Sequence, residues 1–431
     1  MTALLYVVGV LVFVVGLAIS IGLHEAAHMG FGKLFGVRVP QYFVGFGKTV
    51  WSTRRGETEY GVKAFPFGGY VKLIGMLPPG RGDGGGHRSG STGIFSQLVS
   101  DARASENEQI RPGDEDRVFY RLPWWRKVVV MAAGATTNVL IAFLLFAGVF
   151  MIHGVSEPTT TIGKVSDCVV AVHADQTTVP ACTPKDPVTP ARKAGLHRGD
   201  RLVGFNGHRF RSYGTFQRAV RSNGDGPATV TVIRDDRRLV LHTETAINSM
   251  PSLKGSGEVK AGFLGITPTV HAVRKGPGYT VDAMGGYTWD TLKALGSFPQ
   301  KLWGVGKAIL GEQPRATDSP MSVVGASRVA GQIASNRHDS VGDRIAFVFM
   351  LLAGVNLFVG LFNFVPLLPL DGGHIAGALY EALRRGIARL LRRPDPGYFD
   401  VAKLLPVAYV MAGLLLVVTV ILVYADLVVP V

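Results

Sequence analysis

Four long apolar segments constrain this chain more than any other feature of its sequence. They lie at residues 4–23, 128–152, 346–370 and 404–429. Each has the roughly 20 residues that an α-helix needs to cross the hydrocarbon core of a bilayer. Only 18% of the residues are charged, which is a lower fraction than soluble domains usually have. We therefore expect a polytopic α-helical membrane protein with four transmembrane helices.

The basic residues predict how these helices are oriented. The net charge is +14, but no zinc-finger, homeodomain or RNA-binding pattern accompanies it, so nucleic acid is not an expected partner. Arginines gather instead beside the apolar segments, most densely at residues 384–393. By the positive-inside rule the short connection at 371–403 is cytoplasmic. Both termini and the connection between the second and third segments then lie outside the cytoplasm of a plasma or inner membrane.

Three ionisable residues end the first apolar segment. The motif "HEAAH" begins at His24, after 23 residues that carry no charged side chain. Ionisable groups at membrane depth cost about 2.5–3.5 kcal/mol each and are usually functional. On a helix, His24 and His28 lie one turn apart on one face and can hold one Zn²⁺, with Glu25 beside them as a general base. A helix end that merely exposes these side chains to water is the alternative.

A catalytic zinc site needs a third protein ligand at the same depth. The chain crosses the membrane twice more before the third apolar segment ends, so that end returns to the level of the two histidines. There the sequence reads "NFVPLLPLDGGH", in which Asp371 is the expected ligand and His374 its rival. The prolines interrupt the helix, and Gly372 and Gly373 permit a tight turn that directs the Asp371 carboxylate inward.

Between the first two apolar segments we expect mainly cytoplasmic structure. Residues 31–76 alternate apolar and polar side chains between glycines and prolines, which predicts a small membrane-associated β region. Residues 77–125 are rich in Gly, Ser and Arg without hydrophobic periodicity, which is typical of a flexible loop. The first apolar segment, 1–30, lacks the basic leader of a secretion signal and is expected to be retained.

The connection between segments two and three has the pattern of a small α+β domain. Strand and helix patterns alternate through "ARKAGLHRGDRLVGFNG" and continue to a hairpin expected to turn at Asp235 and Asp236. This stretch resembles a PDZ domain in the circularly permuted bacterial arrangement, which we place at 161–249. Residues 250–345 are then expected to lie along the outer membrane face.

The two cysteines of the chain both fall in this outer connection. Cys168 and Cys182 face an oxidising compartment there, which favours a disulfide over two free thiols.

The zinc motif and the distant aspartate together resemble the site-2 protease family of intramembrane zinc metalloproteases. In that family an HExxH helix and an Asn-x-x-Pro…Asp-Gly segment complete one zinc site, and both are present here. The single PDZ-like stretch and the composition are similar to the actinobacterial branch. The resemblance implies one Zn²⁺ held by His24, His28 and Asp371, with Glu25 as the catalytic base.

The resemblance also implies how a substrate is bound. Asn363 and Asn138 would hold the substrate backbone or the oxyanion, although amide bonding between helices is an equally good interpretation of both. A strand containing Gly68 and Gly69 would pair with an extended substrate. The substrates would be transmembrane proteins, anti-sigma factors in particular, first trimmed by a site-1 protease and admitted past the PDZ domain.

Two other functions compete with this interpretation. A non-catalytic PDZ-bearing membrane scaffold would use a structural zinc, but structural sites normally have four protein ligands and the sequence offers three strong candidates. A zinc transporter would need polar residues along several spans, and the second and fourth segments contain few.

Overall fold

The computed structural model describes most of the chain as two compact units. The described residues are 2–79, 99, 101–104, 106, 108, 110–170, 182–183, 185–253 and 258–430. One unit, here called the helical unit, contains Met1–Met151 and Gly276–Val431; the other, the inserted unit, contains Ile152–Lys275. Residues 80–98 of the flexible loop predicted at 77–125 lie outside the described residues.

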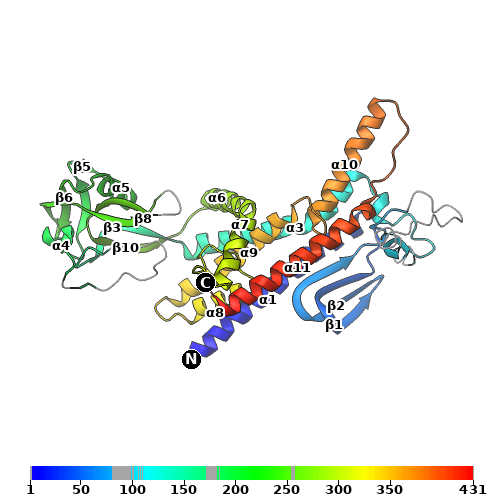
Figure 1. Ribbon diagram of the computed structural model, residues 1–431, viewed down its shortest axis with the longest axis horizontal. Coiled ribbons are helices and arrows are strands. Elements are labelled where there is room, and N and C mark those ends of the chain that lie inside the picture. Colours follow the sequence, from blue (N-terminus) through cyan, green and yellow to red (C-terminus); the bar gives the residue numbers. More distant parts are fainter. Residues whose placement is uncertain are drawn as a thin grey trace. The chain divides into compact units, whose positions relative to one another are not determined.

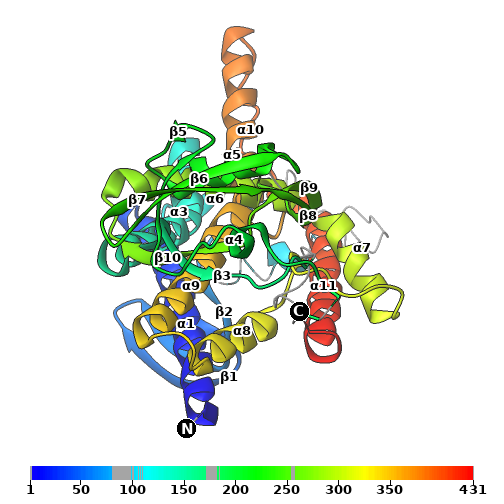
Figure 2. The same ribbon diagram turned by 90° about the vertical axis from the view of Figure 1, so that its left-hand side faces the viewer.

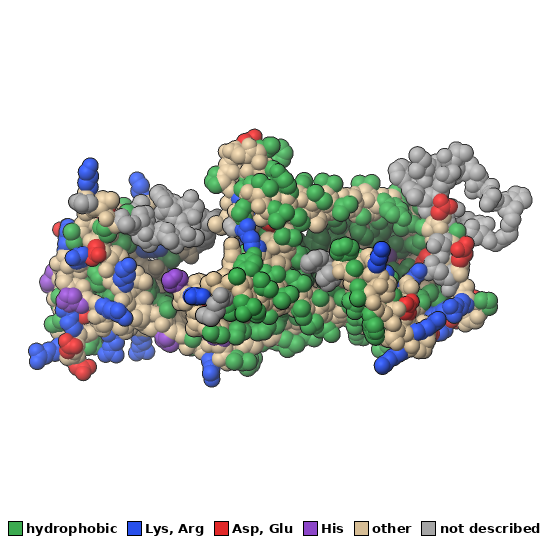
Figure 3. Space-filling model, turned by 90° about the horizontal axis from the view of Figure 1, so that it is seen from below, with side chains coloured by type: hydrophobic (Ala, Val, Ile, Leu, Met, Phe, Trp, Pro, Cys, Tyr) green, Lys and Arg blue, Asp and Glu red, His purple; other side chains and the backbone are tan. Residues whose placement is uncertain are grey.

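Among the described residues of the helical unit, four helices are long and apolar enough to cross a membrane (Figure 1). They are α1 (Thr2–Leu34), α3 (Trp124–Gly148) with the π-helical turn η2 (Val149–His153), α9 (Val341–Asn363), and α11 (Leu405–Val428) with the preceding turn η3 (Val401–Leu404). Hydrophobic side chains cover much of the visible surface of this unit (Figure 3). Such a surface matches lipid better than water, so the chain is a membrane protein.

The helices of this unit pack around small residues. Phe13 on α1 is fully buried together with Ala330 on α8 (Val323–Ser335) and with α9 residues. A Cβ added at Gly9 would lie 2.4 Å from the Cβ of Ala334, so α1 and α8 approach each other closely because Gly9 has no side chain. Helix α11 makes its contacts with α8 and with α7 (Phe298–Ile309), which follows α6 (Pro277–Gly296).

The third candidate span ends earlier than the sequence predicted. Helix α9 stops at Asn363 rather than at residue 370, because Pro366 and Pro369 cannot donate the hydrogen bonds of a continuing helix. The connection predicted as a loop at 371–403 then begins with the 20-residue helix α10 (Asp371–Leu390). Its Ala, Leu and Arg content favours a helix, and the loop prediction was wrong there.

The two glycines after Asp371 also act differently from the prediction. They lie in the first turn of α10 rather than in a tight turn. A Cβ at Gly372 would lie 2.1 Å from the carbonyl oxygen of Val365, and one at Gly373 would lie 2.7 Å from the amide nitrogen of Leu368. Glycine is needed because the segment joining α9 to α10 folds directly onto this turn.

A long β-hairpin lies against α1. It consists of β1 (Gln41–Arg55) and β2 (Thr58–Lys72), paired antiparallel with several register shifts, where the sequence predicted shorter strands. The hydroxyl of Tyr42 donates a hydrogen bond of 2.8 Å to the carbonyl oxygen of Gly22 on α1. This contact places the hairpin within a turn of the "HEAAH" motif.

The inserted unit is built on an antiparallel sheet whose strand order is β10-β3-β4-β6-β7, with β5 paired to β4. The strands are β3 (Val155–Val165), β4 (Arg201–Phe205), β5 (His208–Arg209), β6 (Pro227–Arg234), β7 (Arg237–Glu244) and β10 (Ile266–Val273). The predicted hairpin turn is present, and Asp235 and Asp236 both have positive φ. A separate hairpin pairs β8 (Ala246–Pro251) with β9 (Glu258–Phe263).

This unit is larger than the domain predicted at 161–249. Strand β10 pairs antiparallel with β3, so residues beyond 249 complete the sheet instead of lying along a membrane face. The pairing joins residues about a hundred positions apart, which local sequence patterns do not reveal. The helices after Gly276 remain in the helical unit.

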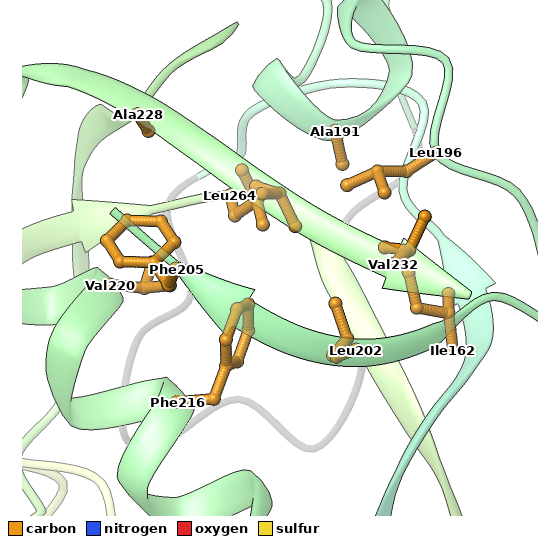
Figure 4. Close-up of a cluster of buried hydrophobic side chains, with 11 residues drawn as sticks. Ile162, Ala191, Leu196, Leu202, Phe205, Phe216, Val220, Ala228, Val232 and Leu264 are labelled. Carbon is orange, nitrogen blue, oxygen red and sulfur yellow. The ribbon is translucent and has the colours of Figure 1, made fainter. Parts of the chain in front are cut away.

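The core of the inserted unit lies between the sheet and two helices, α4 (Pro190–Lys193) and α5 (Tyr213–Ser222) (Figure 4). Phe216 of α5 meets Phe205 of β4 edge-on, with ring centroids 5.8 Å apart. The predicted disulfide between Cys168 and Cys182 is present.

One buried carboxylate supports the turn before β4. Burial alone would raise the pKa of Asp200, but hydrogen bonds from Arg234 and from the His197 amide outweigh it and hold that pKa below its ordinary value.

Candidate metal centre

Three side chains from two distant parts of the chain meet at one point in the helical unit. His24 and His28 project from the same face of α1, and Asp371 is the first residue of α10. One oxygen of Asp371 lies 3.4 Å from Nε2 of His24 and 3.3 Å from Nε2 of His28. The two Nε2 atoms are 3.2 Å apart. Two imidazoles and a carboxylate are the donor set of many catalytic zinc sites.

The hydrogen bond of His28 leaves its other ring nitrogen free for a metal. Nδ1 of His28 lies 2.7 Å from the carbonyl oxygen of Val130 on α3. A carbonyl accepts only, so Nδ1 carries the proton and Nε2 presents its lone pair toward Asp371. Both imidazoles are buried, and such a cluster of buried acceptors needs a cation between them. The residues present therefore fit Zn²⁺.

Helix α3 leaves room for this cluster at a single glycine. A Cβ added at Gly134 would lie 2.3 Å from Nε2 of His28 and 2.7 Å from Nε2 of His24, closer than real atoms approach. The sequence indicated Gly134 only through "AGATTNVL", which resembles the Gly-x-x-x-Asn stretch of the second span in the site-2 protease family, and gave it no contact. Its signal was weak, because glycines are common in membrane helices for packing alone.

We expect Gly134→Ala to lower zinc occupancy at least tenfold, because the new methyl group occupies the space beside both Nε2 atoms. Metal analysis of the purified full-length chain measures the effect. Gly148→Ala is the matched control, since that glycine lies on the same helix with no atom within 4 Å of its added Cβ. Equal occupancy in both variants would show that α3 does not border the metal.

Glu25 lies beside the histidines and against the β-hairpin. A Cβ added at Gly69 of β2 would be 3.1 Å from Cγ of Glu25, and the Val71 backbone also contacts the Glu25 carboxyl group. Glu25 is not one of the three clustered ligand side chains. Its carboxylate is thus next to the proposed metal position without being required to hold the metal.

The structure separates the two candidates for the third ligand. The clustered group consists of His24, His28 and Asp371, whose ligand atoms lie within 4.8 Å of one another, and among the residues described it does not include His374. His374, one turn after Asp371 on α10, instead lines a small cavity together with Lys127 and Glu381.

Three other residues were predicted to contact the substrate, namely Asn138, Asn363 and Gly68. Asn138 is buried on α3, one turn after Gly134, and its side-chain oxygen has no hydrogen-bond partner within the described part of the chain. Asn363 is the last residue of α9, which packs against α3. Gly68 has a φ of +113°, and a Cβ there would lie 2.1 Å from the Phe46 ring, so the backbone and the packing both favour glycine at this position.

A buried ion pair that the sequence analysis missed fixes α10 against α3. Nζ of Lys127 lies 2.8 Å from the Glu381 carboxylate, and the two side chains are 7% and 1% exposed. The Phe399 amide donates to the same carboxylate at 3.1 Å. Because Asp371 is the first residue of α10, the Lys127–Glu381 pair also fixes the position of the Asp371 carboxylate relative to the histidines.

Comparison with known proteins agrees with this geometry. Peptidase family M50 matches residues 12–391. The chain is 32% identical to zinc metalloprotease Rip1 of Mycobacterium tuberculosis strain H37Rv over 440 residues, covering 99% of both chains. It is 31% identical to Rip1 of Mycolicibacterium smegmatis over 445 residues, again covering 99% of both chains.

A more distant relative gives the same result. Metalloprotease MmpA of Caulobacter vibrioides is 26% identical over 393 residues, which cover 87% of this chain and 86% of that protein. The chain belongs to peptidase family M50. With its HExxH helix and the clustered aspartate, it is a zinc metalloprotease of the membrane, and the resemblance to site-2 proteases is confirmed.

Proposed function

We propose that this M50 zinc metalloprotease hydrolyses a peptide bond within the membrane-spanning part of its protein substrates. The observation that carries the proposal is the position of the clustered donors, on the long apolar helix α1 and at the start of α10. By the positive-inside argument the site lies near the cytoplasmic face of the plasma membrane, with both chain termini and the inserted unit on the other side.

The site divides metal binding from proton transfer. His24, His28 and Asp371 hold the metal, leaving Glu25 free. When bound, zinc acts as a Lewis acid that polarises a peptide carbonyl and makes water more acidic. The Glu25 carboxylate accepts a proton from the attacking water and later donates it to the departing amine nitrogen. Asn138 offers its amide to the substrate backbone, because its oxygen lacks another partner.

The β-hairpin supplies a way to present an unwound substrate at this point. A helical substrate keeps its carbonyls in internal hydrogen bonds and must become extended before attack. Within the described hairpin, residues 59–62 of β2 pair with β1 on both sides, whereas residues 69–72 pair only with residues 41–44, so the edge at 69–72 is open to an added strand. Gly69 lies against Glu25, so an added strand there passes the catalytic base.

The inserted unit supports a role in substrate selection. We assign it as a permuted PDZ domain, with a cavity of about 210 Å³ between α5 and residues 262–266. Phe216 and Leu264 contribute to its lining. A domain of this size outside the membrane admits substrates whose own outer domain has been removed by another protease. We propose anti-sigma factors, trimmed by a site-1 protease, as the substrate class.

Metal removal tests the proposed activity. The full-length chain in lipid vesicles is given a single-span test protein, with or without a large outer domain. We expect cleavage of the short form, loss of cleavage after treatment with a zinc chelator, and recovery when zinc is returned. Cleavage that continues in metal-free protein would refute the metalloprotease mechanism. Bound zinc without cleavage of either form would favour the scaffold function.

A further inference from the structure

The second half of α10 exposes a stripe of large apolar side chains. The stripe consists of Leu379, Tyr380, Leu383, Ile387, Leu390 and Leu391, whose exposed fractions range from 48% to 84%. Their spacing of three and four residues places them on one side of the helix. In Figures 1 and 2 this half of α10 extends beyond the other helices of its unit. The Phe399 ring meets the Tyr380 ring edge-on, with centroids 5.2 Å apart, and Tyr380 still keeps 51% of its surface exposed.

The other side of α10 is already occupied. Gly377, Ala378 and Glu381 are buried there against α3 and against the segment that returns from α10 to α11. Arg384 fixes that returning segment, because it donates hydrogen bonds to the carbonyl oxygens of Pro396 and Gly397. The chain therefore folds its own loop onto the polar side of the helix and leaves the apolar side open.

Both ends of α10 are tied to membrane-spanning helices. Residues 364–370 join it to α9, and residues 391–400 join it to η3 and α11. A connection between two consecutive membrane spans begins and ends on the same face of the membrane. At about 3.5 Å per residue at most, neither connection lets α10 move far from the lipid headgroups.

The charges around the stripe match a negatively charged surface. Arg389, Arg392 and Arg393 are exposed at the C-terminal end of α10, with Lys403 exposed after them. None of the four forms an ion pair within the described part of the chain. An exposed apolar stripe with free arginines is the pattern of a helix that lies in the interface of an anionic bilayer.

We propose that residues 379–391 of α10 lie in the headgroup layer of an anionic membrane, with the apolar stripe inserted and Arg389, Arg392 and Arg393 bound to lipid phosphates. The proposal depends on the membrane-spanning arrangement given above but not on the proteolytic activity. Asp371 is the first residue of the same helix. Docking of the distal half on lipid therefore fixes the direction from which this carboxylate reaches the histidines.

A fluorescent label on the stripe tests the proposal. The native cysteines are joined in a disulfide, so Ile387→Cys provides a single free thiol for an environment-sensitive dye. The labelled full-length protein is placed in vesicles of phosphatidylcholine, alone or mixed with phosphatidylglycerol, that contain lipids brominated near the headgroup. Ser222→Cys in the inserted unit, an exposed position on α5, is the control label.

We expect the brominated lipids to quench the label at 387 several-fold more than the label at 222, and more strongly when phosphatidylglycerol is present. In a variant that combines Arg389→Gln, Arg392→Gln and Arg393→Gln, quenching of the label at 387 no longer depends on phosphatidylglycerol. Each arginine is expected to strengthen binding of α10 to the anionic membrane about fivefold. Loss of the dependence with the stripe still quenched supports the phosphate contacts directly.

Two results would overturn the proposal. A label at 387 that is reached by an aqueous quencher in both vesicle types shows that the stripe stays in water. A label shielded from both quenchers, with energy transfer between differently labelled copies, shows that a second chain covers it instead. Cleavage of the test substrate is measured in the same vesicles. Lipid quenching in a preparation that cleaves nothing would count against the proposed function alone.

Discussion

Glu25→Gln abolishes cleavage while the protein keeps its full zinc content. Glutamine has the shape of glutamate but cannot accept the proton of the attacking water. General acid–base groups contribute about 10²- to 10⁴-fold to rates, so the cleavage rate falls by at least about 100-fold. Zinc content is unchanged because Glu25 lies outside the clustered ligand group. Cleavage rate and metal content are measured on the same vesicle preparation.

A second glutamate in the neighbouring hairpin provides the control. Glu59 on β2 is half-buried like Glu25, and Glu59→Gln removes the same charge without touching the motif. That variant keeps wild-type cleavage. Wild-type cleavage by Glu25→Gln would place the general base elsewhere, and loss of zinc in that variant would make Glu25 a metal ligand.

The membrane spans and the three clustered side chains could be predicted because each follows from a local constraint on the chain. Hydrocarbon forces each crossing segment to satisfy its backbone internally, so the length of an apolar run reveals a candidate span. The four-residue spacing of His24 and His28 fixes their common face on any helix. The depth argument then led to Asp371, because successive crossings bring the end of the third segment back to the histidines. The structure places these three side chains together.

The parts that escaped prediction depend on contacts between distant residues. Lys127 and Glu381 are 254 positions apart, and nothing near either residue indicates that they form a buried pair. The space beside Gly134 exists only because α1 and α3 pack with the histidines between them. Strand β10 joins the sheet through its pairing with β3, which extended the inserted unit past residue 249.

Helix α10 was missed for a different reason. Its large apolar residues are exposed, and the side that packs on α3 carries Gly377, Ala378 and Glu381, so the segment lacks the buried apolar face of an ordinary surface helix. Two glycines in its first turn also lower its local helix propensity. This helix, which the sequence did not reveal, carries the third proposed ligand.

Asp371→Ala removes zinc from the protein, and cleavage is lost with it. The carboxylate is one of three donors, and loss of a group that merely orients a ligand already costs about 10- to 100-fold in metal affinity. Loss of a donor itself is therefore expected to exceed about 100-fold. Zinc affinity is measured by competition with a chromophoric chelator on protein that elutes as a single species from size-exclusion chromatography.

His374→Ala is the decisive companion variant, because the sequence offered His374 as the rival ligand. That residue lines the cavity beside Lys127, outside the clustered group. His374→Ala therefore keeps its zinc, and Asp395→Ala, on the exposed loop after α10, leaves both zinc and cleavage unchanged. Zinc lost from His374→Ala but retained in Asp371→Ala would make His374 the third ligand and would require α10 to turn about its axis by roughly 60°, the angle between residues three positions apart on a helix. That turn would break the Lys127–Glu381 pair that holds α10 in its present orientation. Asp371→Ala and His374→Ala together therefore test which residue is the third metal ligand and how α10 is oriented.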